Sequence, residues 1–197
     1  MTTAGLLLIA GFAVFMAGAA AWRLPYQGPT GERMPHLHAD RVRLRWIHTA
    51  MLAAMVLTPA GLAATAFVAA HPAVWAGAAA YAVGAMPWVL HLSFRLTVQE
   101  RVAAVYAAGG GIPDWYEPVE AWVGLGHRFH MAVSYGSAIL LAWGLSEAQV
   151  ISGWLAWGGA AWGALWLAGL AVPRTRFAFE PPFWAHLFTF AVGITLL

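Results

Sequence analysis

Cysteine is absent from the 197-residue chain, and so is lysine. Without cysteine the chain can form no disulfide, no thiolate metal site and no cysteine-bound iron–sulfur cluster. Charged residues make up only 9% of the chain, against about 25% in an average soluble domain. This composition excludes a soluble enzyme, a disordered chain and a coiled coil. The arginines form no basic patch, so we expect no nucleic-acid partner.

Hydrophobic residues, by contrast, make up 61% of the sequence. They gather in runs close to the roughly 20 residues that a membrane-spanning helix needs. The sequence therefore predicts an all-α fold, a polytopic integral membrane bundle of six transmembrane helices in a single domain, residues 1–197. The six predicted spans are Gly5–Trp22, Trp46–Ala70, Val74–Leu92, Val119–Leu145, Val150–Val172 and Pro182–Leu197.

A short interfacial helix is predicted between the third and fourth spans. Thr97 and Glu100 fit the T-x-x-E capping box that begins a helix. The stretch Val98–Ala108 follows, and three glycines from Gly109 onward are typical of a helix end. We expect this helix to lie at the membrane surface.

The arginines orient the predicted bundle. All ten positive residues are arginines in or beside the loops of one side, and the opposite loops, His71–Ala73 and Ser146–Gln149, contain none. By the positive-inside rule, the arginine side is cytoplasmic and both termini lie outside. The predicted location is a bacterial inner (plasma) membrane. Expected partners are the lipid bilayer and either other membrane subunits or further copies of the chain.

Histidine supplies the main functional signal. Counting along each span at about 1.5 Å per residue places five histidines in one layer near the cytoplasmic face. They are His48, His91, His127, His130 and His186. On the fourth span, Glu120, His127 and Ser134 recur on one face, and such a polar face turns toward the interior of a membrane bundle.

This layer contains the components of a b-type haem site: two imidazoles from different helices, apolar walls and arginines for the propionates. His48 and His130 are the predicted axial ligands, and His91 or His186 could replace either of them. Arg45 and Arg128 are predicted to hold the acidic groups. We therefore expect a small membrane redox protein with one haem b.

A non-haem metal ion is the alternative cofactor, because imidazole and carboxylate groups together bind several transition metals. Its candidate ligands are His48, His91, His127, His130, His186 and Glu120. Two alternatives need no cofactor: a non-catalytic accessory or assembly subunit of a membrane complex, and a transporter or proton-linked channel. The sequence leaves open whether the protein is an enzyme.

Two short segments invite comparison with a protease family. SYGSA around Ser137 and WAHLF around His186 resemble the segments that carry the Ser–His dyad of rhomboid intramembrane proteases. That resemblance would imply a serine nucleophile activated by histidine. The rhomboid G-x-S-G sequence is absent, so we do not predict this activity.

Overall fold

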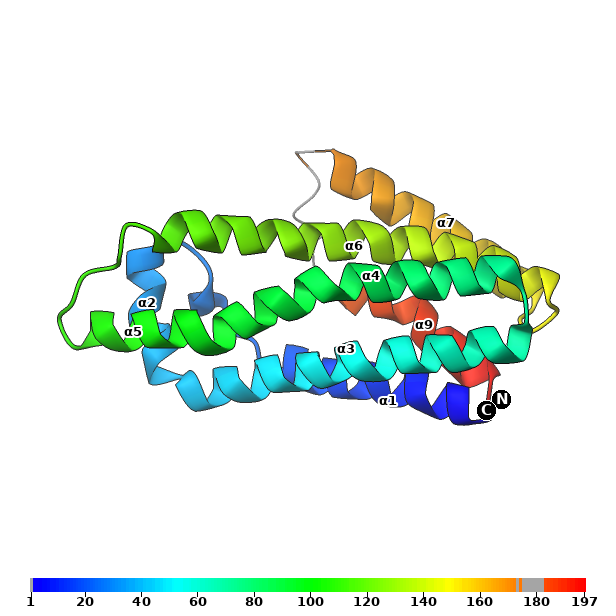
Figure 1. Cartoon of the computed structure of the whole chain (residues 1–197), viewed down its shortest axis with the longest axis horizontal. Helices are drawn as coiled ribbons and strands as arrows, with labels where there is room; N and C mark the ends of the chain where they lie inside the picture. Colours follow the sequence, from blue (N-terminus) through cyan, green and yellow to red (C-terminus); the bar gives the residue numbers. More distant parts are fainter. Residues whose placement is uncertain (1, 173, 175–182) are drawn as a thin grey trace.

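The computed structural model describes residues 2–172, 174 and 183–197. Within these ranges the regular structure is entirely helical (Figure 1). The elements are α1 (Thr2–Ala19), η1 (Leu24–Tyr26), α2 (Thr30–Ala39), α3 (Arg41–Ala69), α4 (Pro72–Phe94), η2 (Arg95–Gln99), α5 (Glu100–Ala107), α6 (Tyr116–Glu147), α7 (Gly153–Ala171) and α9 (Phe183–Thr195).

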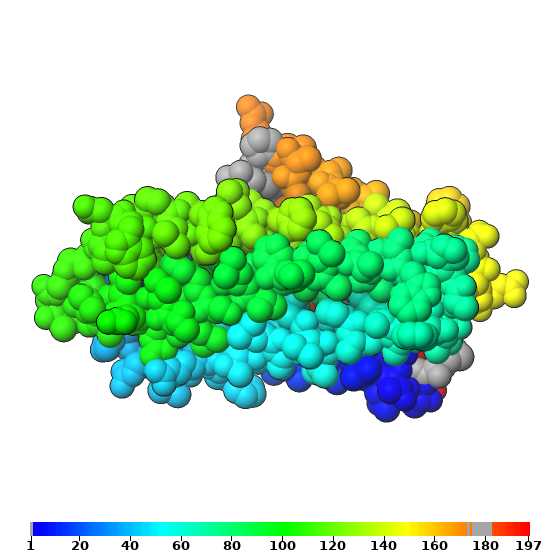
Figure 2. Space-filling model, in the orientation of Figure 1, coloured from blue at the N-terminus to red at the C-terminus, as the bar shows by residue number. Residues whose placement is uncertain are grey.

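Five of these helices form a closed ring. Helix α3 packs on α1 and α4, α4 packs on α6, and α9 completes the ring through contacts with α6 and α1. Helix α7 packs on the outside of α6 and diverges from the body of the molecule (Figures 1 and 2). The ring therefore has an interior onto which side chains from five helices can project.

Four segments of the described chain are long and apolar enough to cross a membrane: Thr2–Ala19, Arg41–Ala69, Pro72–Ala107 and Tyr116–Glu147. Helices α7 and α9 lie where the fifth and sixth spans are predicted, but the count of six spans is not confirmed. Helix α9 has 13 residues and rises only about 20 Å, less than the roughly 30 Å of hydrocarbon. The predicted start of its span, Pro182, lies outside the described residues.

The prediction of a separate interfacial helix after the third span is wrong. Helix α4 continues through η2, one turn of π-helix, directly into α5, so residues 72–107 form one helical rod. The Thr97 hydroxyl donates to the Ser93 carbonyl at 2.8 Å, inside the rod, and therefore forms no capping box. The predicted end is confirmed, since the helix stops at Ala107 and Gly109 adopts the left-handed φ of +87°.

The two ends of the ring differ in chemistry. Helices α2 and α5 pack together at one end, and both ends of the chain lie at the other (Figure 1). The half nearer the termini has a tightly packed apolar core that includes Leu8, Leu62 and Leu141. The half nearer α2 holds the buried Arg33 and the cavity, which is lined by His48, His91 and His127.

Candidate functional site: a histidine-lined cavity

A cavity of about 610 Å³ lies between helices of the ring, in its polar half, and it opens to the surface beside the exposed residues Leu24 and Gln27. This volume is within the range of about 300–1,000 Å³ that is typical of small-molecule sites. Three histidines and two arginines contribute to its lining: His48, His91, His127, Arg95 and Arg128. Most of the remaining wall is apolar and aromatic, supplied by side chains that include Phe15, Trp22, Met51, Trp88 and Phe183.

His48 projects from α3 and is only 2% exposed. Neither of its ring nitrogens has a hydrogen-bond partner among the described residues. The Trp22 ring stands edge-on to it, with the two ring centroids 6.3 Å apart. A buried polar atom without a partner costs about 1–3 kcal/mol, and imidazole is the commonest metal ligand in proteins. His48 therefore has the properties expected of a cofactor ligand.

His127 reaches the cavity from α6, which α4 separates from α3 on one side of the ring. Its ring lies 4.4 Å from the Trp88 ring and 6.0 Å from the His91 ring, measured between centroids. His48 and His127 thus approach one cavity from two helices that lie on different sides of it.

His91, the third histidine of the lining, already has a partner for each nitrogen. Arg95 donates from Nε to its Nε2 at 2.7 Å, and Nδ1 lies 3.1 Å from the Val123 carbonyl. Arginine is always a donor, so Nε2 must accept and Nδ1 carries the proton that it donates to Val123. In this arrangement His91 forms part of the wall and is not an available ligand.

His130 and His186 lie together outside this lining. Both are fully buried, and their ring centroids are 6.5 Å apart. The Trp88 ring, which lines the cavity, packs against the His130 ring with centroids 5.2 Å apart, but His130 itself does not line the cavity. The predicted histidine layer is thus divided into a cavity group and a deeper pair.

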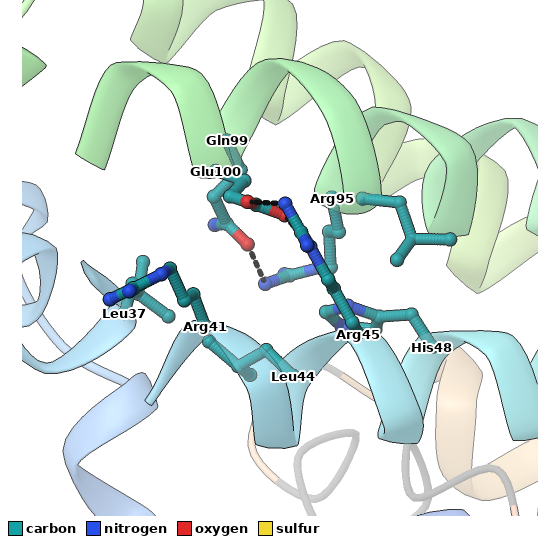
Figure 3. Close-up of a pocket in the computed structure, with 9 residues that line it drawn as sticks. Leu37, Arg41, Leu44, Arg45, His48, Arg95, Gln99 and Glu100 are labelled. Atoms are coloured by element: carbon teal, nitrogen blue, oxygen red, sulfur yellow. Dashed lines mark hydrogen bonds and ion pairs between the residues drawn. The ribbon is translucent and has the colours of Figure 1, made fainter. Parts of the chain in front are cut away.

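The two arginines predicted to hold acidic groups, Arg45 and Arg128, lie in different places. Arg128 lines the cavity, whereas Arg45 binds both carboxylate oxygens of Glu100, with Nε donating at 2.8 Å (Figure 3). Arg45 borders a smaller pocket beside the cavity, and this pocket shares His48 and Arg95 with the cavity.

Glu120, the carboxylate of the predicted non-haem site, lies away from the cavity histidines. It forms an ion pair with Arg33 of α2 and accepts hydrogen bonds from Gln99 at 3.3 Å and Tyr116 at 3.4 Å. Within residues 2–172, 174 and 183–197, no group of three His, Cys, Asp or Glu side chains is arranged to hold a metal ion. The six candidate ligands are therefore not assembled around one point.

Ser137 donates to the Gly77 carbonyl at 2.7 Å, while the Nδ1 of His186 contacts the Tyr81 hydroxyl at 3.3 Å. The pairing of serine with histidine that the rhomboid resemblance implies is absent from these contacts.

Sequence reasoning missed two features of the site. One is the Arg95–His91 pair, although the four-residue separation on a helix already places these side chains on one face. The other is Trp88, whose ring packs against His91 and His127 of the cavity and against His130 of the deeper pair. Comparison of the chain with protein-family models, curated proteins and solved structures yields no match. A function for this chain can therefore be inferred only from the geometry of the site.

Proposed function

We propose that the protein is a small membrane redox protein whose cavity would hold one b-type haem through His48 and His127. The observation that carries this proposal is the buried His48 imidazole, both of whose nitrogens lack partners in the described structure, at the wall of a ligand-sized cavity. A haem iron would take up one of these nitrogens.

The remaining lining fits the same group. A haem requires two imidazoles from different helices, and α3 and α6 supply His48 and His127. Trp22, Trp88 and Phe15 would supply aromatic walls for the macrocycle. Arg128 and Arg95 would pair with the propionates. The haem, when bound, would supply one-electron chemistry, and the protein would bind it, orient it and set its polarity.

This proposal replaces one ligand of the pair predicted from the sequence. His127 and His130 lie about one helical turn apart on α6, and only His127 lines the cavity. His130 as an axial ligand remains a prediction that the same experiment tests.

The test is a set of alanine variants, purified in detergent, whose oxidised and reduced absorption spectra are recorded. His48→Ala and His127→Ala should each abolish or strongly shift the Soret band. His130→Ala should retain it. His36→Ala is the matched control, because His36 is exposed on α2.

Loss of the band in His130→Ala but not in His127→Ala would restore the sequence-derived pair and overturn the proposed one. A colourless wild-type protein that takes up no added haem would overturn the haem proposal itself. The accessory-subunit and channel alternatives would then be separated by co-purification and by liposome flux.

A further inference from the structure

The deeper histidine pair forms a second polar site, separate from the cavity. His130 comes from α6 and His186 from α9, and both side chains are 0% exposed. Their rings are tilted by 43°, with centroids 6.5 Å apart. Tyr81 of α4 packs against both rings, and Phe15 of α1 covers His186 at 4.4 Å between ring centroids. Side chains of four helices thus enclose the pair.

Each imidazole has the same pattern of partners. The Nδ1 of His130 contacts the Ser134 hydroxyl at 3.4 Å, and the Nδ1 of His186 contacts the Tyr81 hydroxyl at 3.3 Å. Both Nε2 atoms are buried and have no hydrogen-bond partner among the described residues. Buried polar atoms are nearly always hydrogen-bonded or bound to another group. The two neighbouring Nε2 atoms therefore indicate a group that binds both imidazoles.

The distance between the two ring centroids leaves room for a single metal ion bound by both Nε2 atoms. Metal–imidazole bonds are about 2.0–2.1 Å long, and a ring nitrogen lies about 1.1 Å from its ring centroid. Two imidazoles on opposite sides of one ion therefore have centroids about 6.2–6.4 Å apart. The observed separation is 6.5 Å.

The residues around the two rings favour a monovalent ion. The chain has no cysteine, and no carboxylate contacts either ring in the described structure. Burying a divalent ion between two neutral ligands would leave two uncompensated charges, whereas a monovalent ion leaves one. Cu(I) is monovalent, has a filled d shell that accepts two ligands, and binds imidazole.

We propose that His130 and His186 bind one Cu(I) ion through their Nε2 atoms, within the helix bundle and separately from the cavity. The site does not depend on the haem proposal. Tyr81 and Ser134 act as positioning residues, because their hydroxyls engage the Nδ1 atoms and leave the Nε2 atoms for the ion.

The test is a competition for Cu(I) between the purified protein and the chromophoric chelator bicinchoninate, under anaerobic conditions. The wild-type protein should keep one equivalent of Cu(I) per chain from binding to the chelator. His130→Asn and His186→Asn should each lose that equivalent. His36→Asn, at an exposed position, should retain it, and Tyr81→Phe should retain it with weaker binding.

His48→Ala separates the two proposals, because it should lose haem and keep copper. X-ray absorption on the copper-loaded wild type should show two nitrogen neighbours, which tests the site even if a histidine variant does not fold. If no copper is withheld, or if it is retained in both asparagine variants, the proposal is wrong. A trapped water, or a His130 proton directed at the nearby Gly84 carbonyl, then accounts for the pair.

Discussion

Arg95 and His91 form a fixed pair in the cavity wall, in which the arginine Nε donates to the histidine Nε2 at 2.7 Å. A second guanidinium nitrogen of Arg95 reaches the Gln99 side-chain oxygen at 3.4 Å. Arg95 is the first residue of the π-helical turn η2. Both nitrogens of His91 are therefore engaged, and the pair forms part of the cavity wall.

Removing the guanidinium should therefore destabilise the protein. Arg95→Met leaves the buried Nε2 of His91 without its donor, and we expect a loss of about 1–3 kcal/mol in the free energy of unfolding. Denaturant unfolding in detergent measures the change. Arg101→Met, at an exposed position on α5, is the control and should fall within about 0.5 kcal/mol of the wild type. Equal stability of both variants would contradict the assigned role of Arg95.

The ion pair between Arg33 and Glu120 should contribute more than the one between Arg45 and Glu100. The side chains of the first pair are 10% and 16% exposed, whereas Arg45 is 61% exposed. Arg33→Met leaves the largely buried Glu120 carboxylate with only its Gln99 and Tyr116 donors and should cost about 1–3 kcal/mol. Arg45→Met should cost about 0–1 kcal/mol. Unfolding of the two variants under one set of conditions tests the ranking, and the reverse order would refute it.

Acid should selectively weaken the connection between η1 and the start of α3. Tyr26 donates to Asp40 at 2.7 Å, and this hydrogen bond, assisted by Arg23 and Arg43, lowers the pKa of Asp40. A lowered pKa in the folded state means that ionised Asp40 stabilises the fold above its unfolded pKa of about 3.9. That stabilisation is lost as the pH falls through the lower, folded value.

Tyr26→Phe should therefore be less stable than the wild type near neutral pH, and the difference should shrink below about pH 4. Unfolding curves recorded over a pH series measure this. Tyr106→Phe is the control, since Tyr106 bonds no carboxylate in the described structure. A stability difference that widens on acidification would show that the assigned linkage is wrong.

The contact between α4 and α6 should not tolerate a methyl group at Gly144. A Cβ there would lie 2.8 Å from the Val74 backbone nitrogen, which cannot move away cheaply. Gly144→Ala should cost about 1–3 kcal/mol in unfolding free energy. Gly136→Ala, on the same helix with open space around its Cβ, should be neutral or slightly stabilising. Comparable losses in both variants would argue against this packing.

Much of the helical framework follows from sequence. The predicted span ending at Ala70 corresponds to α3, which ends at Ala69, and the span starting at Val119 corresponds to α6, which starts at Tyr116. Apolar runs and glycine stops indicate such elements directly. Helix α2 was missed, because it is only 10 residues long, contains Pro35 and has no side-chain cap.

The site was predicted only in outline. Counting residues along the spans predicts five histidines in one layer, but it cannot show that His127 lines the cavity while His130 does not. Nor could it show that Arg45 binds Glu100, because that pair forms only when α4 continues through η2 and brings Glu100 close to α3. Both facts depend on side-chain packing between helices, which no pattern within one segment encodes.

The most direct test of the account is the reduced-minus-oxidised absorption spectrum of the purified wild-type protein, with the haem content measured on the same sample. We predict one haem per chain and an α-band near 560 nm, the value typical of a b-type haem with two histidine ligands. Protein that contains no haem, and that binds none when haem is added, would contradict the central claim.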